Sequence, residues 1–201
     1  MLKKEAKEIT GGLSKPSKMP GPAYSLPAQA CITGAKLVKI PGTVCHGCYA
    51  LKGNYKRFPA VRLALARRLE SLQHPRWVEA MAALIYGEEV FRWHDSGDLQ
   101  SAGHLKRIFE VCSKTPETSH WLPTREHKFL PLSTDSIPKN LIIRVSGTKV
   151  NGAAPSFWPW TSQVTDKKGE KNCPAPEQGG QCKSCRQCWD RSIPNIVYAK
   201  H

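Results

Sequence analysis

The sequence predicts an α/β protein built as a partial (β/α) barrel with a mainly parallel sheet. Short runs of β-forming residues alternate with amphipathic helical runs between residues 59 and 147. Such alternation requires right-handed crossovers, which set neighbouring strands in parallel. The length of 201 residues is below the ~250 residues of a complete eight-unit barrel, so we expect an incomplete one.

The central part of the chain contains the predicted helices and strands. Proline suits the first turn of a helix, so Pro59 and Pro75 are expected to begin helices over 59–73 and 75–88, where apolar residues recur at helical spacing. A third helix is expected over 102–114. Strands are predicted over 90–94, 119–126 and 140–147, and the run "NIVYAK" at 195–200 is expected to be a last strand.

The two ends of the chain differ from this centre in composition. Residues 1–30 are rich in Lys, Pro, Gly and Ser without a period, which indicates an extended basic arm. Residues 31–165 are expected to form the barrel, and residues 166–201 a cysteine-rich metal-binding tail packed on it. Together they would form a single globular unit.

The charge balance favours a polyanionic partner. Thirty Lys and Arg stand against 16 Asp and Glu, a formal net charge of +14, which indicates nucleic acid or a nucleotide, with a generally basic surface as the alternative. No run approaches the ~18 apolar residues of a membrane span, and no signal-peptide core is present. We therefore expect a cytoplasmic protein with no membrane partner. Cytoplasmic thiols stay reduced, so the eight cysteines are predicted to be metal ligands where they cluster.

Four cysteines lie in the tail. Cys182, Cys185 and Cys188 form a C-x2-C-x2-C run, and Cys173 precedes it by eight intervening residues. This run resembles the ligation of a [4Fe-4S] cluster in bacterial ferredoxins. Structural zinc more often takes two C-x2-C pairs separated by a longer loop. The spacing therefore favours iron and sulfur, with zinc as the alternative.

A second group of cysteines contains only three members. Cys45 and Cys48 form a C-x2-C pair in "VCHGC", and Cys31 lies thirteen intervening residues upstream. Three ligands leave one coordination position open for a substrate or cofactor. A closed Cys3His zinc site using His46, or ligands shared between the two groups, are the alternatives. Cys112 lies on the apolar face of a predicted helix and is expected to be a buried, inert thiol.

Polar residues follow three predicted strands, where ligands bind in parallel α/β folds. Guanidinium groups bind carboxylates or phosphates through two hydrogen bonds, although an arginine can equally pair with an acidic residue. A histidine here can belong to the core, and an aspartate can cap a helix. The candidate catalytic residues are His94, Asp95, Asp98, Arg125 and Arg144, and the candidate cofactor-binding residues are Gly97, Asp98, Thr124 and Ser146.

The motifs "YSLPAQAC", "VCHGCYA", "FRWHDSGDLQS", "WLPTREHK", "IIRVSG" and "CPAPEQGGQCKSCRQCWD" resemble those of the phage gene product 88 family. The chain more remotely resembles the radical S-adenosylmethionine (SAM) enzymes. In those enzymes, three cysteines hold a [4Fe-4S] cluster whose open iron binds the amino and carboxylate groups of SAM, at the carboxyl ends of the strands of a partial barrel. The first resemblance implies a phage protein in the host cytoplasm.

The second resemblance assigns roles to particular residues. The C-x2-C pair of the radical SAM enzymes falls on Cys45 and Cys48, with His46 where an aromatic residue is usual. Cys31 replaces the first cysteine across a gap of thirteen residues instead of three. Asp98 or Asp95 would accept the amino group of SAM, the tail cysteines would hold an auxiliary cluster, and a flavodoxin or ferredoxin would donate electrons. The alternative is a non-catalytic nucleic-acid-binding protein with structural zinc or iron–sulfur centres.

Overall fold

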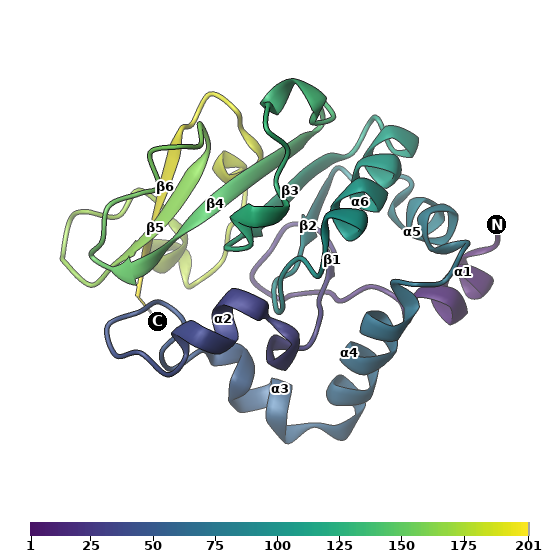
Figure 1. The fold of residues 1–201 in the computed structure, drawn as a ribbon, viewed down its shortest axis with the longest axis horizontal. Helices are drawn as coiled ribbons and strands as arrows, with labels where there is room; N and C mark the ends of the chain where they lie inside the picture. The colour runs from purple at the N-terminus through teal and green to yellow at the C-terminus, as the bar shows by residue number, and fades with distance from the viewer. Residues whose placement is uncertain (201) are drawn as a thin grey trace.

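The sheet of this computed structural model, which describes residues 1–200, has six parallel strands in sequential order. The strands are β1 (Ala23–Tyr24), β2 (Val90–Trp93), β3 (Ser119–Thr124), β4 (Leu141–Val150), β5 (Thr161–Thr165) and β6 (Asn195–Ala199). The sheet is open, with β1 and β6 at its edges (Figure 1). The predicted α/β class and parallel sheet are confirmed.

The helices lie mostly where the apolar periodicity places them. They are α1 (Lys3–Thr10), α2 (Ile32–Leu37), α3 (Gly53–Arg57), α4 (Pro59–Ser71), α5 (Trp77–Ile85) and α6 (Ala102–Lys114). Short 3-10 turns include η1 (Ala28–Ala30), η2 (Tyr49–Leu51) and η6 (Gln187–Trp189). Pro59 occupies the first turn of α4, and the Ser101 hydroxyl caps α6 by accepting a hydrogen bond from His104 N. No helix within residues 1–200 has the length and apolar character that a membrane span requires.

The N-terminal residues form regular structure where an extended arm was predicted. Lys3–Thr10 form α1, whose Ala6 packs with Ala80 and Leu84 of α5. Gly11 ends this helix in the left-handed region at φ 74°, a conformation that glycine adopts without steric cost. Farther along, Tyr24 of β1 is fully buried and donates a hydrogen bond to Thr10 O at 2.7 Å. The apolar contacts of α1 and the pairing of β1 with β2 thus build this segment into the domain.

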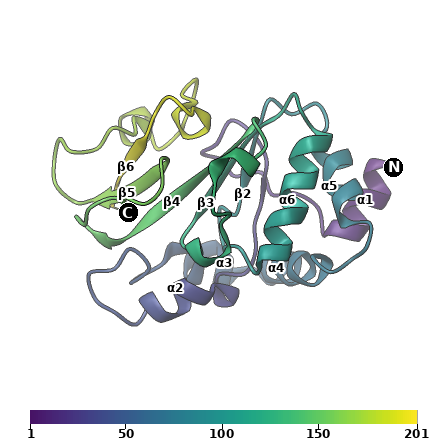
Figure 2. The ribbon, with the colours of Figure 1, turned by 45° about the horizontal axis from the view of Figure 1, so that its top comes forward.

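The two faces of the sheet are covered by different parts of the chain. Alternate residues of β2, β3 and β4, among them Trp93, Leu122 and Ile143, pack in the main core with α5 and α6, as side-chain alternation along a strand requires. Cys112 of α6 is fully buried in this core, as predicted. The opposite residues, such as Ile142, face Cys188 and other residues of the C-terminal tail. Figure 2 shows the tail segment beside β6 on the side away from α6.

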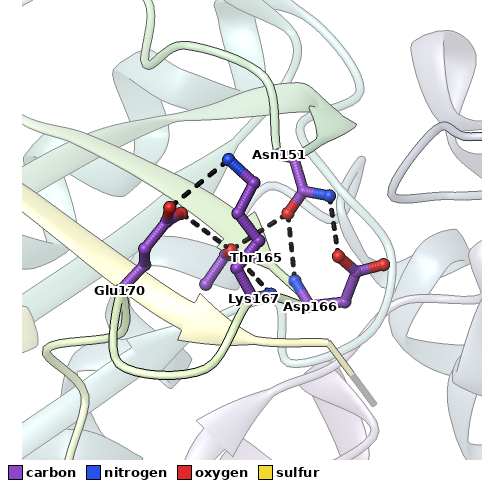
Figure 3. Close-up of polar contacts among 5 residues, drawn as sticks. All are labelled: Asn151, Thr165, Asp166, Lys167 and Glu170. Atoms are coloured by element: carbon purple, nitrogen blue, oxygen red, sulfur yellow. Dashed lines mark hydrogen bonds and ion pairs between the residues drawn. The ribbon is translucent and has the colours of Figure 1, made fainter.

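A polar cluster links the loops that follow β4 and β5 (Figure 3). The Asn151 amide oxygen accepts hydrogen bonds from Thr165 Oγ1 at 3.0 Å and Asp166 N at 3.1 Å, and its nitrogen donates to Asp166 Oδ1 at 2.7 Å. Lys167 pairs with Glu170 at 3.3 Å. These groups are hydrogen-bond and ion-pair partners of one another. The cluster therefore has a structural role, because it connects the ends of β4 and β5.

Candidate metal centres

The fold gathers Cys31, Cys45 and Cys48 although they are separated in sequence. Cys31 precedes α2, and Cys48 precedes η2. A β-carbon built on Gly34 would lie 3.6 Å from Cys31 Sγ and 3.8 Å from Cys45 Sγ, so both sulfurs border the same small space. The charges of Cys45 and Cys48 both act on the Cys31 thiol. Cys31 therefore lies near the C-x2-C pair in the fold, and a metal site formed by the three cysteines stays a prediction.

This three-cysteine group lies beside the carboxyl ends of β2 and β3. Burial, and to a smaller extent the negative charges of Asp98, Cys48, Cys45 and Glu126, raise the pKa of the Cys31 thiol to about 12. Burial also raises the pKa of Cys45, while the positive charge of Arg125 opposes the shift. Two of the predicted site residues, Asp98 and Arg125, thus belong to the surroundings of the cysteines.

Asp98 is held by three hydrogen bonds. Its carboxylate accepts from Thr124 Oγ1 at 2.6 Å, Arg125 N at 2.9 Å and Leu99 N at 2.8 Å. Burial raises the pKa of Asp98 to about 6, against these hydrogen bonds, which lower it. The cap of α6 is Ser101, so the helix-cap interpretation of Asp98 is wrong. Thr124 serves here as a donor that orients Asp98.

Glu126 is a further residue of this site, which the sequence analysis did not single out. Its side chain is fully buried, and it accepts hydrogen bonds from Thr33 N at 2.6 Å and Thr33 Oγ1 at 2.9 Å. Thr33 lies two residues after Cys31 in α2. Glu126 therefore fastens the helix that follows Cys31 to the end of β3. The acidic residue that follows Arg125 in "WLPTRE" was the available signal.

The turn after β2 connects the site to the N-terminal segment. Asp95 accepts hydrogen bonds from Ser25 Oγ and, at 2.8 Å, from Tyr55 Oη, and its backbone oxygen accepts one from Tyr49 Oη. A β-carbon on Gly97 would lie 2.5 Å from Leu26 Cβ, so close packing by itself requires glycine there. This turn thus fixes β1, η2 and α3 relative to one another.

His94 combines an unusual backbone conformation with a buried ring. It has φ 59°, and its Nδ1 lies 3.1 Å from Tyr24 O. Its Nε2 is buried without a hydrogen-bond partner among the described residues, as is Nε2 of His104, whose ring lies 5.3 Å from that of His94. Burial lowers the pKa of His94 to about 4. His94 is therefore a neutral residue packed against α6.

The side chains of Arg144 and Ser146 belong to the face of β4 that also bears Ile142, opposite the main core. Arg144 is fully buried and donates four hydrogen bonds of 2.8–3.0 Å to the carbonyl oxygens of Gln187, Cys188, Asp190 and Ile193. These bonds direct its guanidinium to the tail, on the face of the sheet opposite the main core. Ser146 accepts a hydrogen bond from Ser162 Oγ at 3.1 Å. Arg144 thus holds the part of the tail that contains Cys188.

The four tail cysteines line one pocket, together with Pro174, Trp189 and other residues. Cys188 Sγ lies 3.2 Å from Tyr198 Oη. Burial raises the pKa of Cys188 to about 12, while Tyr198 and the positive charges of Arg92 and Arg144 oppose the shift. Neither arginine forms an ion pair with a carboxylate within residues 1–200. Positive charge without a carboxylate partner therefore acts on Cys188, and the charge of Arg92 also acts on Cys182.

Both cysteine-bearing segments lack an apolar core of their own. In residues 31–49 only Thr43 and Cys45 are buried, and in residues 166–194 only Cys188 is. Both segments nevertheless fold into defined turns, with little apolar burial to hold them. As they stand, the side chains of residues 1–200 contain no group of three or more His, Cys, Asp or Glu arranged to hold a single metal ion.

Comparison with known proteins gives one match. A family model described as gene product 88 matches residues 1–191, which confirms the resemblance of the sequence to that phage family. No curated protein and no solved structure matches the chain.

Proposed function

The chain belongs to the gene product 88 family, and we propose that it is an iron–sulfur protein with two centres. Cys31, Cys45 and Cys48 would hold a [4Fe-4S] cluster with one open iron, and Cys173, Cys182, Cys185 and Cys188 a second, fully ligated one. We further propose that the first centre binds SAM and acts on nucleic acid or a nucleotide in the host cytoplasm. The sequential strand order supports this proposal, because a partial (β/α) barrel has the same order.

The observation that carries the proposal is the gathering of cysteines in segments without a core. Cys31 and Cys45 come from opposite ends of a poorly buried segment, yet their sulfurs border one space beside Gly34. Metal ligation supplies folding free energy to such segments because the site forms only in the folded chain. The donor set of three thiolates, with no histidine among the groups acting on Cys31, fits a cluster that leaves one iron open.

The residues around the three cysteines suit a ligand with an amino and a carboxylate group. When bound, a cluster with an open iron supplies the electron that cleaves SAM. Asp98 is held rigidly by three donors, and a carboxylate has about four acceptor positions, so one is left for an ammonium group. Arg125 donates through Nε to Gly147 O at 3.3 Å, and its terminal nitrogens suit a carboxylate.

The positive charge beneath the tail suits a centre that carries negative charge. Four thiolates bring more negative charge than the metal neutralises, and a buried charge is tolerated only with a partner. Arg92 and Arg144 provide that positive partner. The guanidinium of Arg92 lies 4.5 Å from the centre of the Trp121 ring. This arrangement supports thiolate ligation rather than four neutral thiols.

Metal analysis of matched variants tests the proposal. Anaerobically purified protein should be brown and contain about eight irons and eight sulfides per chain. Cys31→Ala should lose the first centre and keep about four irons, whereas Cys182→Ala should lose the tail centre. A colourless protein with stoichiometric zinc would contradict the proposal and favour the alternative of a nucleic-acid-binding protein with structural zinc. Full metal content in Cys31→Ala would refute the three-cysteine site.

A further inference from the structure

Acidic residues are missing from a long stretch of the chain. Between Glu8 and Glu70 there is no Asp or Glu, whereas ten residues are Lys or Arg. This stretch therefore accounts for +10 of the net charge of +14. It also contains Cys31, Cys45 and Cys48, so the charge of the protein is concentrated in the part that forms the first centre.

The fold displays this charge on neighbouring elements. The helix α2, the turns η1 and η2, and the helices α3 and α4 contact one another in succession, and Figure 1 shows α2, α3 and α4 together below the sheet. Apart from the buried Arg68 of α4, their basic side chains are exposed, and none forms an ion pair within residues 1–200. We call this region the basic surface; it comprises Lys36, Lys39, Lys52, Lys56, Arg57 and Arg62.

The basic surface reaches the three-cysteine group. A β-carbon built on Gly47 would lie 3.6 Å from Lys52 Nζ. Gly47 lies in the turn between Cys45 and Cys48, so the ammonium group of Lys52 lies over that turn. A polyanion bound along α3 would therefore pass next to the first centre.

Exposed apolar side chains lie between these cations. Ile40, Phe58 and Leu63 are 51%, 47% and 61% exposed. The guanidinium of Arg57 lies 5.8 Å from the centre of the Phe58 ring. Proteins that bind single strands combine cations for the phosphates with aromatic and apolar side chains for the unpaired bases.

We propose that the basic surface binds single-stranded nucleic acid and presents it to the three-cysteine centre. The binding follows from the charge and the exposed apolar groups alone, and only its catalytic purpose rests on the proposed function. A single strand fits better than a duplex, because its bases are free to contact Phe58 and its neighbours. Phosphate contacts make such binding strongly dependent on salt.

Fluorescence anisotropy with a labelled single-stranded oligonucleotide, titrated with full-length protein at several salt concentrations, tests this proposal. The test variant carries Lys52→Glu, Lys56→Glu, Arg57→Glu and Arg62→Glu. The control carries Lys106→Glu, Lys114→Glu, Lys139→Glu and Lys168→Glu, four exposed residues outside the basic surface with the same change in net charge. Circular dichroism confirms that both variants fold.

The test variant should bind at least about 100-fold more weakly, and its logarithmic salt slope should fall by about 3, since each lost contact to a single strand removes ~0.7. The control should stay within about threefold of the wild type, and Phe58→Ala should weaken binding at least about fivefold. Equal losses in both charge variants, tighter binding of a duplex of the same sequence, or no binding by the wild type would overturn the proposal.

Cys31→Ala separates this proposal from the proposed function. The variant should lose iron and still bind the oligonucleotide within about threefold of the wild type, because the basic surface does not include the cluster. Wild-type protein that binds the oligonucleotide through the basic surface but contains zinc would refute the iron–sulfur function and leave this inference standing. Brown protein with intact clusters that does not bind the oligonucleotide would refute this inference and leave the iron–sulfur function standing.

Discussion

Replacing Glu126 with alanine should release the segment that carries Cys31. Two hydrogen bonds from Thr33 to this buried carboxylate, at 2.6 and 2.9 Å, connect α2 to the end of β3. Each bond to a charged group contributes ~1.5–3 kcal/mol, so we expect Glu126→Ala to cost ~3–6 kcal/mol locally. Helix α2 has no fully buried residue, so little else offsets this loss.

The expected result is selective loss of the first centre. Anaerobically purified Glu126→Ala should contain about four irons instead of about eight, and the amides of residues 32–38 should exchange hydrogen faster. Glu126→Gln keeps one acceptor oxygen and should lose about half as much free energy. Thr33→Val removes only the hydroxyl donor, so its loss of free energy should be similar to that of Glu126→Gln. Full iron content and unchanged exchange in Glu126→Ala would refute the role assigned to this carboxylate.

Two further predictions concern the tail and the core. Arg144→Met should leave four carbonyl oxygens, one of them in the buried Cys188, without their donor and destabilise the protein by ~3 kcal/mol. It should deplete iron from the tail centre, and Arg144→Lys should not rescue either property, because an ammonium group lacks the fork of donors. Urea unfolding and iron content measure both effects, and an unchanged unfolding midpoint would contradict them. Burial lowers the pKa of His120 to about 3, so the unfolded chain binds a proton that the folded chain does not, and stability falls as the pH drops from about 6.5 toward 3. Between pH 7 and 5 this amounts to about 2 kcal/mol. Burial raises the pKa of Asp98 to about 6, which changes stability with pH in the opposite direction. The test therefore compares the wild type with His120→Gln, whose stability should lose the ~2 kcal/mol fall between pH 7 and 5. Equal pH dependence of stability in the two proteins would refute the prediction.

The parts of the fold with strong periodicity were predictable from the sequence. Helices α4, α5 and α6 have apolar residues at helical spacing, and β2, β3 and β4 are short apolar runs between turns. Helix α1 was missed because its apolar residues that pack on α5, Ala6 and Ile9, are few and surrounded by lysines. Strand β5 was missed because its sequence, "TSQVT", is mostly polar.

The cysteines of the candidate site stand out in the sequence, and the residues around them do so less. That Cys31 joins Cys45 and Cys48 in one metal site stays a prediction from spacing. The role of Arg144 depends on which face of the sheet its side chain occupies, which becomes known only when the tail is placed. Glu126 is visible in the sequence as an acidic residue at the end of a predicted strand. Its contact with Thr33 spans 93 positions of the chain, so a single sequence does not show which group it binds.

The electron paramagnetic resonance spectrum of the reduced protein, recorded anaerobically with and without SAM, tests the central claim most directly. We predict the signals of two [4Fe-4S] clusters, one of which changes when SAM is added and is missing from Cys31→Ala. A spectrum that SAM leaves unchanged, or that Cys31→Ala shares in full with the wild type, would contradict an open iron site at Cys31, Cys45 and Cys48.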